Sequence, residues 1–141
     1  MTQEKYIYPT VKTFRISSKF GKRIHPVTGE RKFHNGVDIA CPVGTILKNT
    51  IGQGRCTKVG YDELNGHFLR IQHDNGLLTS YAHLNKVIIK EGNTVSPGEV
   101  FALTGNTGLG TGAHLHFRVR IMQKGQWIDV DPELYFQFSE K

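Results

Sequence analysis

The chain has 141 residues, of which 38% are hydrophobic and 21% are charged, and it carries a net charge of +6 at pH 7. The length suits one domain with a single core, and the composition excludes an intrinsically disordered chain. The positive charge favours an anionic polymer as a partner. The basic residues are scattered and no nucleic-acid-binding motif accompanies them, so we expect no nucleic acid partner.

The N-terminal stretch MTQEKYIYPTVKTF lacks the apolar segment of a secretory signal, and no run approaches the roughly eighteen apolar residues of a membrane span. The sequence therefore predicts a soluble chain with no membrane span, and we expect a monomer. Such a chain stays in the cytosol, is exported by another route, or is the trimmed mature part of a longer protein. These alternatives stay open.

Short β-type runs separated by glycine or other turn residues follow one another along the chain, which is typical of an antiparallel all-β domain. We expect residues 1–19 to form an arm packed on a folded domain of residues 20–137. The predicted strands cover residues 36–40, 45–49, 55–61, 67–73, 77–83, 100–104 and 114–122. The fold prediction is thus a single antiparallel β-sheet domain with almost no helix.

Three turn signals divide these runs. The tripeptide DNG at 74–76 predicts a hairpin with a type I′ turn between the fourth and fifth predicted strands. The tripeptide SPG at 96–98 predicts a second tight reversal. The tripeptide DPE at 131–133 predicts the N-cap and first turn of a short C-terminal helix that reaches Phe136.

The sequence HLHFRVRI at 114–121 alternates polar and apolar residues with the period of two of a β-strand. One face of this strand is therefore apolar, and the opposite face presents, in order, His114, His116, Arg118 and Arg120. Two imidazoles on one face of a strand indicate half of a metal or acid/base site, which needs partners from elsewhere in the chain.

The sequence HNGVD at 34–38 offers such partners. Its central Asn-Gly pair is poor helix sequence, so we expect a loop that leads into a strand, with His34 and Asp38 both able to point inward. These two residues and one imidazole from residues 114–122 make three ligands of the types that zinc accepts, with a fourth position left for water. The sequence SYAHL at 80–84 adds His83. Each motif alone is weak, and together they become specific.

These segments resemble the lysostaphin/LytM-type zinc metallopeptidases, which cleave peptides of bacterial cell-wall peptidoglycan. The resemblance covers most of the chain, with the same order and spacing of motifs. The motifs are FGKRIHPVTGERKFHNGVDIA at 20–40, IQHDNGLLTSYAHL at 71–84, EGNTVSPGE at 91–99 and TGNTGLGTGAHLHF at 104–117.

The resemblance implies one zinc ion (Zn²⁺) per chain, held by His34, Asp38 and His116, with His83 and His114 as a catalytic pair beside the metal. It also implies a small antiparallel β-sheet domain whose loops wall a groove for an extended peptide. The two imidazoles of the pair are suited to shuttle protons and to stabilise the oxyanion, and which of them does which task stays open.

Three residues are candidates for substrate contact at this groove. Tyr81 lies two residues before His83 and is expected on the same face of its strand. Arg118 stands where the family commonly has an acidic residue after HLHF, and it either extends the positive charge of the groove or is a solvated arginine. His67 follows an Asn-Gly pair, where the family commonly has a small or polar residue.

Four further residues are not expected to act at the site. His25 and His73 are expected to pack or to hydrogen-bond to backbone groups. Cys41 and Cys56 are either two buried thiols on neighbouring strands or a disulfide that closes a short loop.

The sequence therefore predicts a zinc-dependent endopeptidase that hydrolyses peptide cross-links or bridges of peptidoglycan, with peptidoglycan peptides as its partners. The alternative is a noncatalytic peptidoglycan-binding or activator module of the same fold, against which the complete set of site residues argues. We expect action at the bacterial cell wall, outside the cell or in the periplasm, by a phage-type lysin or a trimmed secreted enzyme. Whether glycine bridges or D-alanyl cross-links are cut stays open.

Overall fold

The structure is a computed structural model that describes residues 5–10, 14–24, 28–108 and 112–137. Its described strands are β1 (Tyr6–Ile7), β2 (Ile16–Ser18), β3 (Gly21–Ile24), β4 (Arg31–His34), β5 (Val37–Ala40), β6 (Ile46–Lys48), β7 (Gly54–Asp62), β8 (Gly66–His73), β9 (Leu78–Val87), β10 (Thr94–Val95), β11 (Val100–Thr104), β12 (His114–Gln123), β13 (Gln126–Val130) and β14 (Phe136–Gln137).

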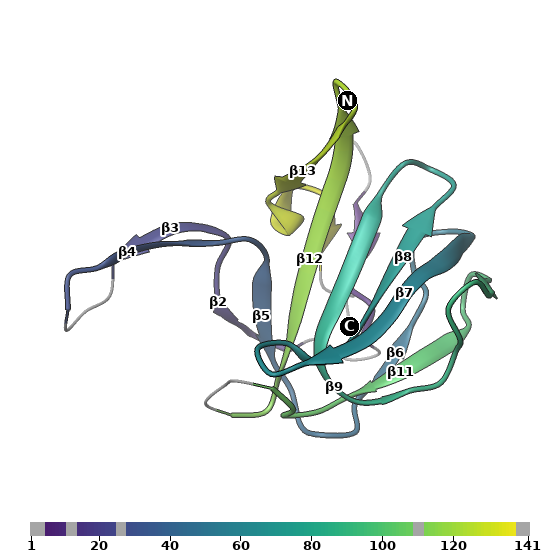
Figure 1. Ribbon diagram of the computed structural model, residues 1–141, viewed down its shortest axis with the longest axis horizontal. Helices are drawn as coiled ribbons and strands as arrows, with labels where there is room; N and C mark the ends of the chain where they lie inside the picture. Colours follow the sequence, from purple (N-terminus) through teal and green to yellow (C-terminus); the bar gives the residue numbers. More distant parts are fainter. Residues whose placement is uncertain (1–4, 11–13, 25–27, 109–111, 138–141) are drawn as a thin grey trace.

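Most of these strands form one antiparallel sheet, in the order β10, β7, β8, β9, β12, β5 and β2. The strand β13 pairs with β12, and β11 joins β6 to the sheet through β9. The hairpin of β3 and β4 is a separate two-stranded sheet that projects away from the rest of the molecule (Figure 1). The prediction of an antiparallel all-β fold is confirmed, with one parallel exception, the pair of β1 and β14.

Each of the seven predicted strands is present, although β9 runs on to Val87 beyond its predicted end. The strands that the sequence did not predict are β1 to β4, β10, β13 and β14. Most of them are two to four residues long, too short to show a hydrophobic period. The longer β13 has no fully buried residue.

The hairpin between β8 and β9 forms as predicted, but its turn is not type I′. A type I′ turn needs a positive φ at both central residues, whereas here only Gly76 has one, at 97°. The N–H of His73 donates to Leu77 O at 2.8 Å, and the N–H of Gly76 donates to His73 O at 3.0 Å. This is the three-residue loop in which a type I turn precedes a left-handed glycine.

The other two turn predictions fare differently. At residues 96–98 the reversal is present, with Gly98 at φ 83° and the N–H of Glu99 donating to Ser96 O at 3.0 Å. The C-terminal helix is shorter than predicted, because it is a 3₁₀ turn over Pro132–Leu134 capped by the Asp131 side chain. Phe136 is not helical but begins β14. No helix among the described residues is long and apolar enough to cross a membrane.

The core lies under one face of the sheet and leaves the other face open. On β12 the alternation is realised, because Leu115, Phe117 and Val119 are fully buried while the histidines and arginines between them are partly exposed. The Phe117 ring contacts the rings of Tyr8 and Phe136. Each such buried side chain contributes roughly 1.5–3 kcal/mol. This burial anchors β12 so that its polar face points away from the core.

Cys41 and Cys56 are both buried and both free. The first alternative, two buried thiols, is therefore the one that the structure shows. They are not on neighbouring strands, since Cys41 follows β5 and Cys56 lies on β7, which are not adjacent in the sheet.

His73 is buried and takes part in a hydrogen-bond chain. Its Nδ1–H donates to Gly52 O at 2.9 Å, and its Nε2 lies 3.0 Å from Thr79 Oγ1, which accepts from the Tyr81 hydroxyl. Burial lowers the pKa of His73 below its ordinary value of 6.5. The folded state therefore binds a proton at this ring less readily than the unfolded state does.

This difference predicts a pH dependence of stability. The contribution of His73 is fully present above the ordinary histidine pKa and is lost as the pH falls below it, because protonation then favours the unfolded chain. Between pH 7.5 and pH 5, the free energy of unfolding of the wild type should fall more steeply than that of His73→Gln. Denaturant titrations of both proteins at each pH measure this, and parallel pH profiles would contradict it.

Candidate active site

Three predicted metal ligands meet at the open face of the sheet. His34 ends β4, Asp38 lies on β5, and His116 lies on β12 directly opposite Asp38 in the antiparallel register. Asp38 Oδ1 is 2.8 Å from His116 Nδ1 and 3.4 Å from His34 Nε2. Gly36 permits this approach, because a Cβ there would lie 2.3 Å from Phe117 O. Within the HNGVD segment only Asn35 and Gly36 lie between β4 and β5, so a short loop leads into a strand, as predicted.

The donor atoms of these three residues fit a zinc ion. They lie within 4.8 Å of one another, and two imidazole nitrogens with one carboxylate oxygen are a donor set that zinc accepts. Burial acts to raise the pKa of Asp38, but hydrogen bonds and positive charge from His116 and His34 outweigh it and hold that pKa well below its ordinary value. Asp38 therefore offers an anionic donor at neutral pH.

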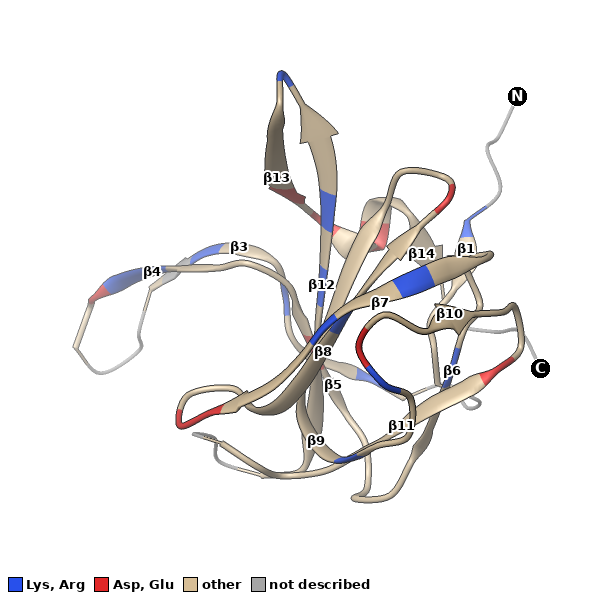
Figure 2. Cartoon of the chain, turned by 45° about the vertical axis from the view of Figure 1, so that its right-hand side comes forward, with Lys and Arg blue, Asp and Glu red and all other residues tan. Residues whose placement is uncertain are grey.

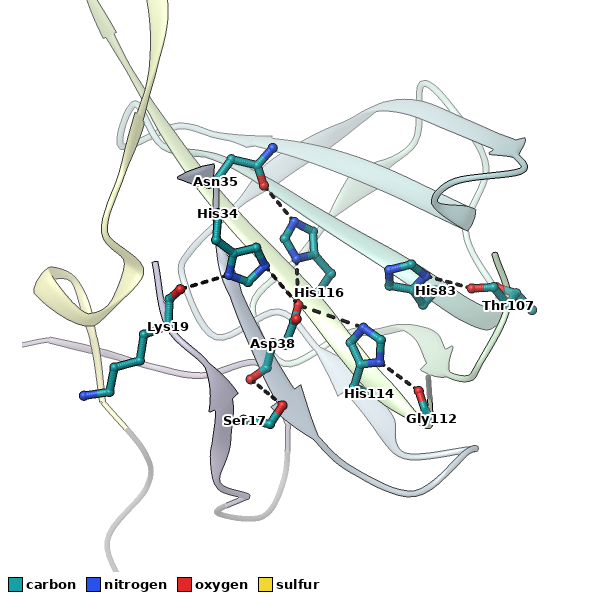
Figure 3. Close-up of polar contacts among 10 residues, drawn as sticks. All are labelled: Ser17, Lys19, His34, Asn35, Asp38, His83, Thr107, Gly112, His114 and His116. Carbon is teal, nitrogen blue, oxygen red and sulfur yellow. Dashed lines mark hydrogen bonds and ion pairs between the residues drawn. The ribbon is translucent and has the colours of Figure 1, made fainter. Parts of the chain in front are cut away.

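In both His34 and His116, the ring nitrogen that does not face Asp38 is held by a hydrogen bond. His34 Nδ1–H donates to Lys19 O at 3.0 Å, so Nε2 is the atom left to bind the metal (Figure 3). His116 Nε2 lies 2.9 Å from Asn35 Oδ1, which leaves Nδ1 for the metal. Such contacts fix both the tautomer and the ring orientation of a metal ligand. Asn35 was not predicted as a site residue, although its place inside the HNGVD motif was a signal.

We expect Asn35→Ala to weaken zinc binding by about 10- to 100-fold, the usual cost of removing the partner of a ligand histidine. The free His116 ring then has no fixed orientation. A chelator competition with the purified protein measures the dissociation constant. Asn93→Ala, at an exposed residue outside the site, is the matched control. Equal zinc affinities of Asn35→Ala and the control would contradict the prediction.

His83 and His114 lie next to this cluster. Their ring centroids are 4.6 Å apart, and His114 Nε2 is 3.9 Å from Asp38 Oδ1. His83 Nδ1–H donates to Thr107 O at 2.7 Å, and His114 Nδ1–H donates to Gly112 O at 2.8 Å (Figure 3). A carbonyl oxygen only accepts, so both rings keep Nε2 free of a proton when neutral.

The backbone and the burial of His83 both prepare its ring for this site. Its φ of 64° is left-handed, which is uncommon for a residue other than glycine and is concentrated at functional sites. Burial has the largest effect on the pKa of His83 and lowers it. The hydrogen bond to Thr107 raises this pKa and the rings of His114 and His116 lower it further, so the net shift is downward. His83 is therefore a neutral base at pH 7.

The three predicted substrate contacts lie in different places. Tyr81 is among the residues that line the pocket beside His116, but its ring is not on the open face as predicted, because it is 1% exposed among Phe101 and Phe117 in the core. The left-handed turn at His83 breaks the alternation, so residues 81 and 83 do not share a face. His67 is exposed, with its ring 4.8 Å from that of Tyr61. Arg118 lines a pocket beside His116.

Two further histidines, His73 and His25, were not expected to act at the site. His73 is bound to Gly52 and Thr79 in the interior, as expected for a packing role. His25 lies outside the described residues.

Comparison with known proteins identifies relatives that share the sequence and the fold. Over 113 residues the chain is 42% identical to peptidoglycan DD-endopeptidase ShyA of Vibrio cholerae serotype O1, a match covering 79% of this chain and 26% of that protein. A zinc-containing peptidase from Vibrio cholerae superposes with a TM-score of 0.77 at 38% identity, over 90% of this chain and 39% of that one. LytU superposes with a TM-score of 0.71 at 34% identity, over 88% and 85%.

The chain spans about a quarter to a third of the length of the curated relatives it matches. Residues 32–132 match the sequence profile described as peptidase family M23. This segment holds all three metal-site residues and both neighbouring histidines. The chain therefore belongs to peptidase family M23.

Proposed function

We propose that this chain is a zinc-dependent endopeptidase that hydrolyses peptides of bacterial peptidoglycan. The observation that carries the proposal is the convergence of two imidazoles, His83 and His114, on a cluster of zinc-ligand type. A noncatalytic binding module needs neither the ligands nor the pair. The names of the relatives, which include peptidoglycan DD-endopeptidases, support peptidoglycan as the substrate.

The residues of the chain divide the chemical work. Zinc at this site supplies a Lewis acid that polarises the scissile carbonyl and acidifies a water molecule. The imidazoles of His83 and His114 hold and move protons at Nε2, because each Nδ1–H is engaged by a backbone carbonyl. An imidazole that has taken up a proton donates it to the leaving amine or to the oxyanion. Asp38 keeps a negative charge against the metal.

Among peptidoglycan bonds, we propose the D-alanyl cross-link rather than the glycine bridge. The support is the identity of 41–42% with three proteins named peptidoglycan DD-endopeptidases. Because one chain supplies all five residues of the site, we propose that a monomer is sufficient. The proposed place of action is the cell wall, reached either as a phage-type lysin or as an exported enzyme.

The test is digestion of purified cell walls by the zinc-loaded chain, with the released fragments identified by mass spectrometry. Directly cross-linked walls should release fragments with a free D-alanine, and glycine-bridged walls should stay cross-linked. The chelator-treated protein serves as the control. Release from glycine-bridged walls alone would contradict the choice of bond. A zinc-loaded protein that binds both walls and cleaves neither would favour the noncatalytic alternative.

A further inference from the structure

Three arginines gather on the open face of the sheet beside the metal cluster. Arg118 on β12 and Arg70 on β8 both pair with Ser80 of the strand between them, so they form one row across three strands. Arg120 follows two residues later on the same face of β12. Figure 2 shows blue arginine segments along β12, with an acidic segment on the neighbouring β13.

A small pocket of about 100 Å³ lies over this row. Arg70, Ser80 and Arg118 line it on one side, and His116 and Asn35 line it towards the metal cluster. The pocket therefore continues directly from the site of the proposed reaction. Asp62 is the one carboxylate among its described lining residues.

That carboxylate does not neutralise the arginine row. Asp62 accepts from the backbone and the side-chain amide of Asn65, at 2.6 and 3.1 Å. Asp62 on β7 pairs with Gly66 on β8. Gly66 is four residues from Arg70, so these two positions lie roughly 13 Å apart along β8. The pocket is thus positive where the arginines lie.

The three arginines carry three positive charges, but among the described residues only Arg118 binds a carboxylate. Asp129 binds Arg118 through two contacts, of which the one to Nη2 is 3.0 Å. Arg120 donates to Ser80 Oγ at 3.3 Å, and its buried Nε has no hydrogen-bond partner in the described part of the chain. Among the described residues Arg70 contacts no carboxylate, and its guanidinium lies 5.8 Å from the centre of the Phe68 ring.

Three guanidinium groups therefore lie on one face of the sheet. Among the described residues, Asp129 is the single carboxylate that binds any of them. Burial, followed by the charges of Arg118 and Arg70, lowers the pKa of Arg120 to about 10, although Asp129 acts to raise it. Like charges at such spacing are unfavourable unless an anion joins them. Two of the five N–H groups of Arg118 donate to Asp129, so three are left to bind a ligand. All five N–H groups of Arg70 are left for a ligand.

We propose that Arg70, Ser80 and Arg118 form a subsite for a carboxylate carried by the peptide substrate. Guanidinium groups are the side chains best matched to a carboxylate, and a serine hydroxyl adds a third donor. Arg118 lies two residues from His116, about 7 Å along the strand. An extended peptide covers this distance in about two residues, so the carboxylate belongs to a residue within about two positions of the scissile bond.

This subsite rests on the proposed endopeptidase function, and its test is a binding measurement that needs no turnover. The probes are synthetic cross-linked peptides in which each carboxyl group in turn is a free acid or a primary amide. One arm varies side-chain carboxyls, and the other varies the C-terminal carboxyl. Calorimetry measures their dissociation constants with the zinc-loaded His83→Ala protein, and a parallel assay measures kcat/KM with the wild type.

We expect amidation at one position to weaken binding about tenfold or more, as hydrogen bonds to a charged group require. Adding Arg70→Gln should abolish the difference between acid and amide, and Arg70→Lys should restore part of it. Arg70 is chosen because, unlike Arg118, it leaves no carboxylate unpaired when replaced. Arg55→Gln is the matched control, since Arg55 is exposed and lines a different pocket.

The subsite would be overturned if each acid bound with the same affinity as its amide, both in the His83→Ala protein that keeps Arg70 and in the protein that also carries Arg70→Gln. If the wild type still cleaves the peptides, the endopeptidase function stands without it. If the acid binds more tightly through Arg70 but no peptide is cleaved, the subsite stands and the proposed reaction fails.

Discussion

Replacing His83 by alanine is expected to lower kcat by about 10²- to 10⁴-fold, the range typical for loss of a general acid or base. Zinc content should stay at about one ion per chain, because His83 is not one of the three clustered ligands. His83 is neutral at pH 7 and its Nε2 is free, so its ring is prepared to take a proton. Hydrolysis of a cross-linked peptide and metal analysis of the same sample measure both quantities.

The double variant with His114→Ala sharpens this test. The two rings are 4.6 Å apart and act on the same reacting atoms in the proposed mechanism. The double variant should therefore lose little more activity than the worse single variant, since residues that act as a unit are not additive. An enzyme without His83 that keeps its full kcat, or one that loses its zinc, would contradict the assigned role.

Replacing Asp38 by alanine is expected to abolish zinc binding and all detectable hydrolysis. The change removes the one anionic donor of the cluster and the shared partner of His34 and His116. The two imidazoles would then face each other without a carboxylate between them. Metal analysis should find close to one zinc in the wild type and almost none in Asp38→Ala at micromolar zinc.

Metal removal from the wild type provides the comparison. Chelation should abolish its hydrolysis and added zinc should restore it, whereas zinc should not restore Asp38→Ala. The matched control is Asp74→Ala, because Asp74 is exposed in the turn between β8 and β9. The fold should survive in both variants, because the Asp38 side chain is on the face of the sheet opposite Val37 and Ile39 of the core. Zinc bound by Asp38→Ala with wild-type affinity would rule out the ligand assignment.

Local patterns predicted what depends on neighbours in the chain. The alternation of β12 separates Phe117 from His116 because successive side chains of any strand point to opposite faces. The hairpin at residues 74–76 was predicted because its Asn-Gly pair is a turn signal carried by neighbouring residues. Its type was wrong, because the loop length depends on the register of β8 against β9.

The same limit explains the error at Tyr81. Period-two reasoning requires an unbroken strand, and the backbone turns at His83 with a φ of 64°. That conformation depends on contacts from other segments, such as Asn65 O, which accepts from the N–H of His83, and Thr107 O, which accepts from its ring. Neither contact has a signature near residue 83.

By itself the sequence determined the all-β class, because local period and turn residues are properties of short segments, and through its resemblance to a known family it predicted the five candidate site residues. Only the tertiary structure decided which nitrogen of each clustered histidine is left for a metal. It also decided that Asn35 supports His116, and that Arg70, Ser80 and Arg118 form one row. These facts depend on the register between strands that are far apart in the sequence, which is set by the packing of the buried face as a whole.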